Sequence, residues 1–165
     1  MEIIQVIGYK NSGKTTIVAA LLHYFSRNGI KTASLKHHGH GGWPLGLDNK
    51  DNILHQKAGA IVSGVEGEGL LQFMSQNSWR LEQLISIYKV LEVELLIIEG
   101  YKNEDFRKIV LINEEADLPL LDEVKSIIAV VTSISLSESL KWPVFKYGDF
   151  ITLCEWAGKN YRNKI

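Results

Sequence analysis

The residues most able to do chemistry stand near the start of the chain. Residues 8–15 follow the pattern G-x-x-x-x-G-K-T. A loop of this kind turns successive backbone N–H groups inward, and the helix that follows adds its positive end, so phosphate oxygens meet fixed donors. Lys14 would neutralise charge on the β- and γ-phosphates, and the Thr15 hydroxyl would ligate Mg²⁺. The pattern predicts a nucleoside triphosphate site contacted by Asn11, Ser12, Gly13, Lys14, Thr15 and Thr16.

Acidic residues that could complete a magnesium site follow along the chain. Glu99 comes directly after the apolar run at residues 95–98, which we expect to be an inner strand ending beside the phosphate loop. A carboxylate there can hold Mg²⁺ or orient the attacking water. Asp51 could sense the γ-phosphate and metal as a switch segment does, or it could be a helix N-cap. We predict Thr15, Asp51 and Glu99 as metal ligands, and Lys14 and Glu99 as catalytic residues.

A second group of reactive side chains lies at residues 36–40, which read Lys-His-His-Gly-His. Lys36 ends the second expected strand, at the edge where ligands bind. Clustered histidines can contact a nucleotide or substrate, or bind a transition metal, and a solvated glycine-flexed loop is the third interpretation. After a later strand, Thr132 and Ser133 could face the base or be plain loop residues.

Segments with strand and helix patterns alternate along the chain, which predicts a mostly parallel sheet covered by helices. Strands are expected at Glu2–Ile7, Lys31–Lys36, Ala60–Val65, Gly69–Met74, Leu95–Ile98, Lys108–Ile112, Ser126–Val131 and Val144–Phe145, and helices at Lys14–Arg27, Asp51–Ala58, Ser78–Leu91 and Gly148–Tyr161. The strands on either side of the Glu-Gly-Glu-Gly turn at residues 66–69 would form a hairpin. The predicted fold class is α/β: a P-loop NTPase with a mostly parallel twisted sheet, helices on both faces and an antiparallel hairpin.

Length and composition narrow the class of protein further. The 165 residues predict a single nucleotide-binding domain over residues 1–165. The net charge of −1 argues against bulk nucleic-acid binding. The single cysteine, Cys154, fits a reducing compartment, and we find neither a signal peptide nor an apolar run of membrane-spanning length. We therefore expect a cytoplasmic protein that binds neither nucleic acid nor a membrane.

Several segments together resemble the molybdopterin-guanine dinucleotide biosynthesis protein B (MobB) family. They are residues 8–16, 36–38, 57–60 after Asp51, 99–102, 108–111 and 127–131, and the resemblance continues to Asp149, so it covers nearly the whole chain. It implies GTP as the nucleotide, Mg²⁺ as the metal and weak hydrolysis. It also implies a homodimer that assists the guanylyltransferase attaching GMP to molybdopterin, with molybdopterin as a further partner. The matching motif positions add Lys36, His37 and Lys102 to the nucleotide-binding residues.

The chain departs from the family pattern after the histidines. The family's stretch runs on into His-Asp-x-Asp, whereas here residues 40–44 read His-Gly-Gly-Trp-Pro and carry no acid. Asp51 then remains the acidic candidate for a switch. Two other function classes stay open: a metallochaperone GTPase that uses His37, His38 and His40, and a small-molecule kinase. Acceptor-dependent ADP formation would identify the kinase.

Overall fold

The computed structural model describes residues 1–37, 50–75, 77–136 and 140–162. Its contacts divide the chain into two compact units, one formed by residues 1–39 and 87–165 and the other by residues 40–86. Among the described residues, no helix combines the length and the apolar character needed to cross a bilayer.

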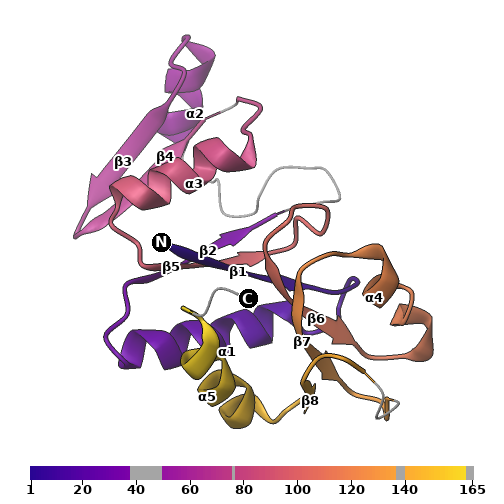
Figure 1. Ribbon diagram of the computed structural model, residues 1–165. Helices are drawn as coiled ribbons and strands as arrows, with labels where there is room; N and C mark the ends of the chain where they lie inside the picture. The colour runs from indigo at the N-terminus through magenta and orange to yellow at the C-terminus, as the bar shows by residue number, and fades with distance from the viewer. Residues whose placement is uncertain (38–49, 76, 137–139, 163–165) are drawn as a thin grey trace. The chain divides into compact units, whose positions relative to one another are not determined.

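The larger unit is built on a six-stranded sheet in which every neighbouring pair of strands runs parallel (Figure 1). The strand order is β2-β5-β1-β6-β7-β8, so β1 lies between β5 and β6. β5 and β7 are apolar except for their last residues, Glu99 and Thr132, and are buried at every position, as is typical of inner parallel strands. The strands are β1 (Glu2–Ile7), β2 (Thr32–Lys36), β5 (Leu95–Glu99), β6 (Arg107–Ile112), β7 (Ile127–Thr132) and β8 (Val144–Lys146).

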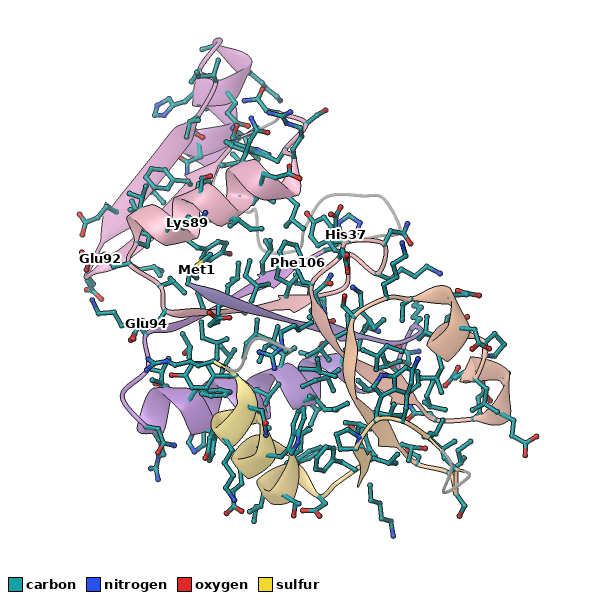
Figure 2. The ribbon with its side chains drawn as sticks, viewed as in Figure 1. Met1, His37, Lys89, Glu92, Glu94 and Phe106 are labelled. Carbon is teal, nitrogen blue, oxygen red and sulfur yellow. The ribbon has the colours of Figure 1, made fainter. Side chains whose placement is uncertain are left out.

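The carboxyl ends of the parallel strands meet at one edge of the sheet, where open α/β folds bind ligands. Figure 2 shows Met1 and Glu94 at the edge where β1 and β5 begin, and His37 at the opposite edge, where β2 ends. The register places Lys36 of β2 and Val6 of β1 directly beside Glu99 at the end of β5. Residues far apart in the sequence are thereby brought together at this edge.

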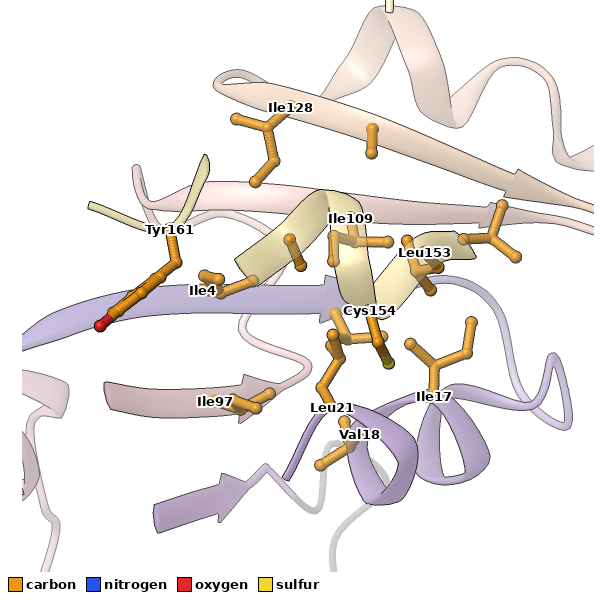
Figure 3. Packing of buried hydrophobic residues seen from close by; sticks show 14 of the residues in the cluster. Ile4, Ile17, Val18, Leu21, Ile97, Ile109, Ile128, Leu153, Cys154 and Tyr161 are labelled. Carbon is orange, nitrogen blue, oxygen red and sulfur yellow. The ribbon is translucent and has the colours of Figure 1, made fainter. Parts of the chain in front are cut away.

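Helices cover both faces of the sheet. On one face, α1 (Lys14–Arg27) and α5 (Phe150–Asn160) pack over the strands through a buried cluster that includes Leu21, Ile97 and Cys154 (Figure 3). On the other face, α4 (Leu120–Glu123) packs its leucines against β6 and β7. The predicted α/β class, with a parallel sheet and helices on both faces, is confirmed.

The smaller unit contains α2 (Lys50–Lys57) and a hairpin of β3 (Ser63–Gly67) and β4 (Leu70–Met74). The hairpin was expected, but its turn is two residues long instead of four. Gly67 pairs with Leu70, and the intervening Glu68 and Gly69 have φ angles of 52° and 79°. Positive φ at both central residues is the type I′ geometry, whose twist matches that of the strands. β3 therefore ends two residues later than expected, at Gly67, and it also begins later, at Ser63 instead of Ala60.

Most other boundaries differ from the sequence-based expectation by one or two residues, and the helices differ further at two places. The helix expected from residue 78 is α3 (Leu81–Val90). Just before it, the Arg80 backbone N–H donates to Gln83 Oε1 at 3.0 Å, so this N–H is satisfied by a side chain of the first turn. The short helices η1 (Glu115–Asp117) and α4 were not expected at all. Segments of three and four residues are too short to show a helical repeat.

Candidate functional site

The phosphate loop joins β1 to α1 and has the backbone that its glycines were expected to allow. Asn11 and Gly13 adopt φ angles of 61° and 90°. A Cβ on Gly8 would lie 2.7 Å from Ser12 Oγ, and a Cβ on Gly13 would lie 2.6 Å from Tyr147 Cε2. A side chain at either position would require Ser12 or Tyr147 to move, and at Gly13 the positive φ would strain it as well, so both positions favour glycine. The loop leads directly into the N-terminus of α1, as an anion site requires.

The side chains of the loop divide into buried and exposed groups. Ser12 is buried, whereas Asn11, Thr15 and Thr16 are exposed and therefore accessible to a ligand. Lys14 Nζ donates to the Tyr9 carbonyl at 2.6 Å and lies 3.5 Å from Ser12 Oγ. Burial lowers the pKa of the Lys14 ammonium below its ordinary value, and nearby Lys36 lowers it further, while Glu99 opposes the shift. A triphosphate would supply the negative charge that this ammonium lacks.

Thr15, Lys36 and Glu99 form one hydrogen-bonded cluster beside the loop. The Thr15 hydroxyl lies 3.1 Å and 2.9 Å from the two carboxylate oxygens of Glu99, to which it donates. Lys36 Nζ lies 2.8 Å from Glu99 Oε1 and 3.1 Å from Thr15 Oγ1. The Glu99 side chain is only 9% exposed. Three elements, α1, β2 and β5, thus supply the cluster.

The oxygen atoms of this cluster fit the magnesium ion that the loop implies. A hydroxyl and a carboxylate are hard oxygen donors, and Mg²⁺ is commonly held by one or two such groups together with phosphates and water. Within the described part of the chain, no group of three or more His, Cys, Asp or Glu side chains converges to form a closed metal site. Two of the predicted metal ligands, Thr15 and Glu99, lie within hydrogen-bond distance of each other. Asp51 lies exposed in the first turn of α2, in the smaller unit, and its metal role stays a prediction.

The remaining predicted contacts have different surroundings. His37 donates its backbone N–H to the Glu99 carbonyl at 2.9 Å, and its ring lies 4.2 Å, centroid to centroid, from that of Tyr101. Lys102 forms an ion pair with Glu123 at 3.3 Å, and no contact joins it to the phosphate loop among the described residues. His38 and His40 lie outside the described residues, so the transition-metal alternative stays a prediction.

Asn113 is a residue of the site that sequence reasoning missed. It follows β6, and its Nδ2 donates to the Ser12 carbonyl at 3.0 Å, while its Oδ1 accepts from Ser133 Oγ at 3.1 Å. The buried Asp117 carboxylate accepts from the Asn113 backbone N–H at 2.8 Å and fixes the turn. Ser133, a candidate for the base side, is thereby linked to the phosphate loop. An asparagine after an apolar strand was the available signal.

Two buried polar side chains fix the loop that follows Glu99. Gln5 Nε2 donates to the carbonyls of Gly100 and Tyr101 at 3.0 Å and 2.8 Å. Lys108 Nζ donates to the carbonyls of Glu104 and Phe106, and burial lowers the pKa of this lysine. Gln5 and Lys108 are polar residues within otherwise apolar strands, and this pattern is the feature of the sequence that could have marked them as structurally important. They hold the loop that carries Tyr101 against His37.

Comparisons with known proteins agree with this architecture. The model of the MobB family, described as molybdopterin guanine dinucleotide synthesis protein B, matches residues 3–133. A probable molybdopterin-guanine dinucleotide biosynthesis adapter protein from Bacillus subtilis is 41% identical over 89% of this chain and 86% of its own length.

Solved structures give the same result. The crystal structure of Bacillus subtilis MobB has a TM-score of 0.83 and 35% identity, covering 99% of this chain and 100% of that one. A MobB homologue from Bacillus stearothermophilus has a TM-score of 0.81 and 32% identity over the same shares. Because the family model matches residues 3–133 and a relative is 41% identical over most of both lengths, the chain belongs to the MobB family.

Proposed function

We propose that this chain binds GTP with Mg²⁺ at the phosphate loop, hydrolyses it slowly, and assists a guanylyltransferase that attaches GMP to molybdopterin. The observation that carries the proposal is the contact between Thr15 and the buried Glu99 carboxylate at the start of α1. A hydroxyl and a carboxylate placed beside a phosphate loop are the protein ligands that a triphosphate-bound Mg²⁺ needs.

Each residue of the site would have its own role in binding and hydrolysing the triphosphate. The amides of residues 11–16 and the Lys14 ammonium bind the β- and γ-phosphates and stabilise the charge that develops on them. Mg²⁺, when bound, supplies further neutralisation of that charge. Glu99 accepts hydrogen bonds and orients a water for attack, and Lys36 and His37 line the same edge. Lys102 would reach the nucleotide only by leaving Glu123.

The accessory role draws on the relatives. The Bacillus subtilis relative is named as a probable biosynthesis adapter protein. A protein that holds GTP and turns it over slowly suits such a role better than it suits a kinase. We propose a cytoplasmic homodimer whose partners are the guanylyltransferase and molybdopterin.

Intrinsic turnover tests the slow-GTPase part of the proposal. No arginine of the described residues contacts the phosphate loop: Arg107 donates to carbonyls at the end of α5, and Arg162 pairs with Glu94. Without an arginine that neutralises the charge of the transition state, we expect single-turnover GTP hydrolysis below about 1 s⁻¹, the lower end of the range for kinases. A faster rate in the isolated chain would contradict the proposal.

The accessory role has its own test, because binding and assistance can fail separately. We expect the chain with Mg²⁺-GTP to increase formation of molybdopterin guanine dinucleotide by the guanylyltransferase. Lys14→Ala, which removes the phosphate-binding ammonium, should give no increase. An equal increase with Lys14→Ala would show that assistance does not depend on the phosphate loop.

A further inference from the structure

Lys36 occupies a particular place in the candidate site. Its ammonium contacts two oxygens at once, Glu99 Oε1 at 2.8 Å and Thr15 Oγ1 at 3.1 Å. These are the oxygens that fit Mg²⁺. A positive charge that touches both atoms stands where a divalent cation would have to make its own contacts.

The burial of Glu99 explains why a cation is needed there. A carboxylate that is 9% exposed has lost most of its water, and an unpaired buried charge is strongly unfavourable. Lys14 is close enough for Glu99 to raise its pKa, but its Nζ donates to the Tyr9 carbonyl instead. Lys36 therefore supplies the direct counter-charge.

The backbone holds Lys36 in place while its side chain can still move. β2 and β5 pair in register with Lys36 beside Glu99, so the two side chains start from neighbouring backbone positions. The Lys36 side chain is 58% exposed, and a long flexible stem can carry its ammonium away into water. The contact is enforced by the sheet and is still reversible.

We propose that Lys36 is a built-in cation that holds the metal-binding oxygens of Thr15 and Glu99, and that Mg²⁺ displaces it on entry. This inference rests on the proposed function, because it concerns the metal of the same nucleotide site. Lys36 and the divalent ion bind competitively, so the lysine sets how strongly the site depends on the metal. It is a positioning residue that keeps the carboxylate aimed at Thr15 in the empty protein.

The direct test measures Mn²⁺, a spectroscopic substitute for Mg²⁺, on the nucleotide-free full-length protein by electron paramagnetic resonance. Lys36→Met keeps the aliphatic stem and removes the charge, so it should tighten Mn²⁺ binding by about fivefold or more, within the range of couplings between sites. Lys36→Arg should weaken it, because a guanidinium can hold the carboxylate with two hydrogen bonds. Lys31→Met is the matched control: Lys31 is an exposed strand-entry lysine paired with Glu92, and its loss should change nothing.

Glu99→Gln in the Lys36→Met background locates the effect, because it should remove the gain in Mn²⁺ affinity. Equal Mn²⁺ affinity of the unaltered protein and Lys36→Met would overturn the inference, as would a gain that survives Glu99→Gln. Circular dichroism and thermal melting confirm that each variant folds. The Mn²⁺ titration contains no nucleotide, so its result can be interpreted even if the protein fails to bind GTP. A failure to bind GTP would refute the proposed function alone.

A second measurement uses the nucleotide. The quantity to compare is the Kd for GTP without Mg²⁺ divided by the Kd with Mg²⁺. We expect this ratio to be about fivefold or more higher in Lys36→Met than in the unaltered protein. In that variant nothing neutralises Glu99 when the metal is absent, so its carboxylate repels the phosphates. An unchanged or smaller ratio would contradict competition between the lysine and the metal.

Discussion

At the scale of single residues, Asn113 shows how one amide can organise a binding loop. Its side chain donates to the Ser12 carbonyl and accepts from the Ser133 hydroxyl, so it ties the phosphate loop to the ends of β6 and β7. Backbone amides bind phosphate well only when they are held in position before the ligand arrives. The position of Asn113 therefore matters although it has no charge to offer a phosphate.

Replacing Asn113 should weaken nucleotide binding without unfolding the chain. Asn113→Ala leaves the Ser12 carbonyl without its donor, and one lost hydrogen bond corresponds to about five- to tenfold in affinity. Titration calorimetry with the triphosphate measures the change. Asn28→Ala is the matched control, because the Asn28 amide bonds to the Tyr24 carbonyl at the far end of α1. Equal Kd values for the two variants would show that Asn113 does not position the loop.

Cys154 provides a test that depends on pH. Burial between α5 and α1 raises the pKa of its thiol from 9.0 to about 11 (Figure 3). The folded state thus keeps a proton that the unfolded state releases above pH 9, so this contribution to stability is present below pH 9 and is lost as pH rises toward 11. We expect a loss of about 2 kcal/mol over that window.

Urea unfolding at several pH values measures this contribution. The difference in unfolding free energy between the unaltered protein and Cys154→Ala removes the effects of the other titrating groups. It should shrink between pH 9 and pH 11 and stay constant below pH 8. A constant difference up to pH 11 would mean that the thiol ionises as easily in the folded protein as in the unfolded chain.

The sequence predicted the residues of the site whose role depends on local pattern. Lys14, Thr15 and Glu99 could be found because a phosphate loop and a strand-ending acid can be recognised in the sequence. Asn113 stands out only as an asparagine after an apolar strand, and its role could not be predicted because its partner Ser12 is 101 positions away and the contact depends on sheet order. The bridging position of Lys36 was missed for the same reason, although its place at a strand end was expected.

At the scale of elements, the turn between β3 and β4 has a residue poorly suited to its backbone. Glu68 occupies the first central position of a type I′ turn with φ of 52°, where Asn is strongly favoured. Glu68→Asn should raise the unfolding free energy of the hairpin by about 0.5–1 kcal/mol. Hydrogen exchange at the amides of residues 63–74 measures it. Glu66→Asn, a strand position with an extended backbone, is the control and should not stabilise the hairpin.

The elements that were predicted well are long or strongly patterned. β1, β5, β6 and β7 carry apolar runs, and α1 starts after Gly13 and ends before Asn28-Gly29. The hairpin boundary was displaced because two Glu-Gly pairs in succession fit a four-residue turn as well as a two-residue turn. The helices η1 and α4 were not predicted, because their formation depends on the Glu114–Asp117 capping box and on packing of the α4 leucines.

At the scale of the whole molecule, the strand order brings the site together. β5 lies between β2 and β1, so the ends of these three strands place Lys36, Glu99 and the phosphate loop side by side. Alternating strands and helices predict a parallel sheet, and the binding edge follows from that, but a sequence does not state which strands are neighbours. The larger unit thus contains every residue of the Thr15–Glu99–Lys36 cluster.

The most direct test of the account is titration calorimetry with GTP and ATP, each with and without Mg²⁺, on the unaltered chain and Lys14→Ala. We predict the lowest Kd for GTP with Mg²⁺ and a loss of measurable triphosphate binding in Lys14→Ala, with its circular dichroism spectrum unchanged. Tighter binding of ATP than of GTP, or full affinity in Lys14→Ala, would contradict the account.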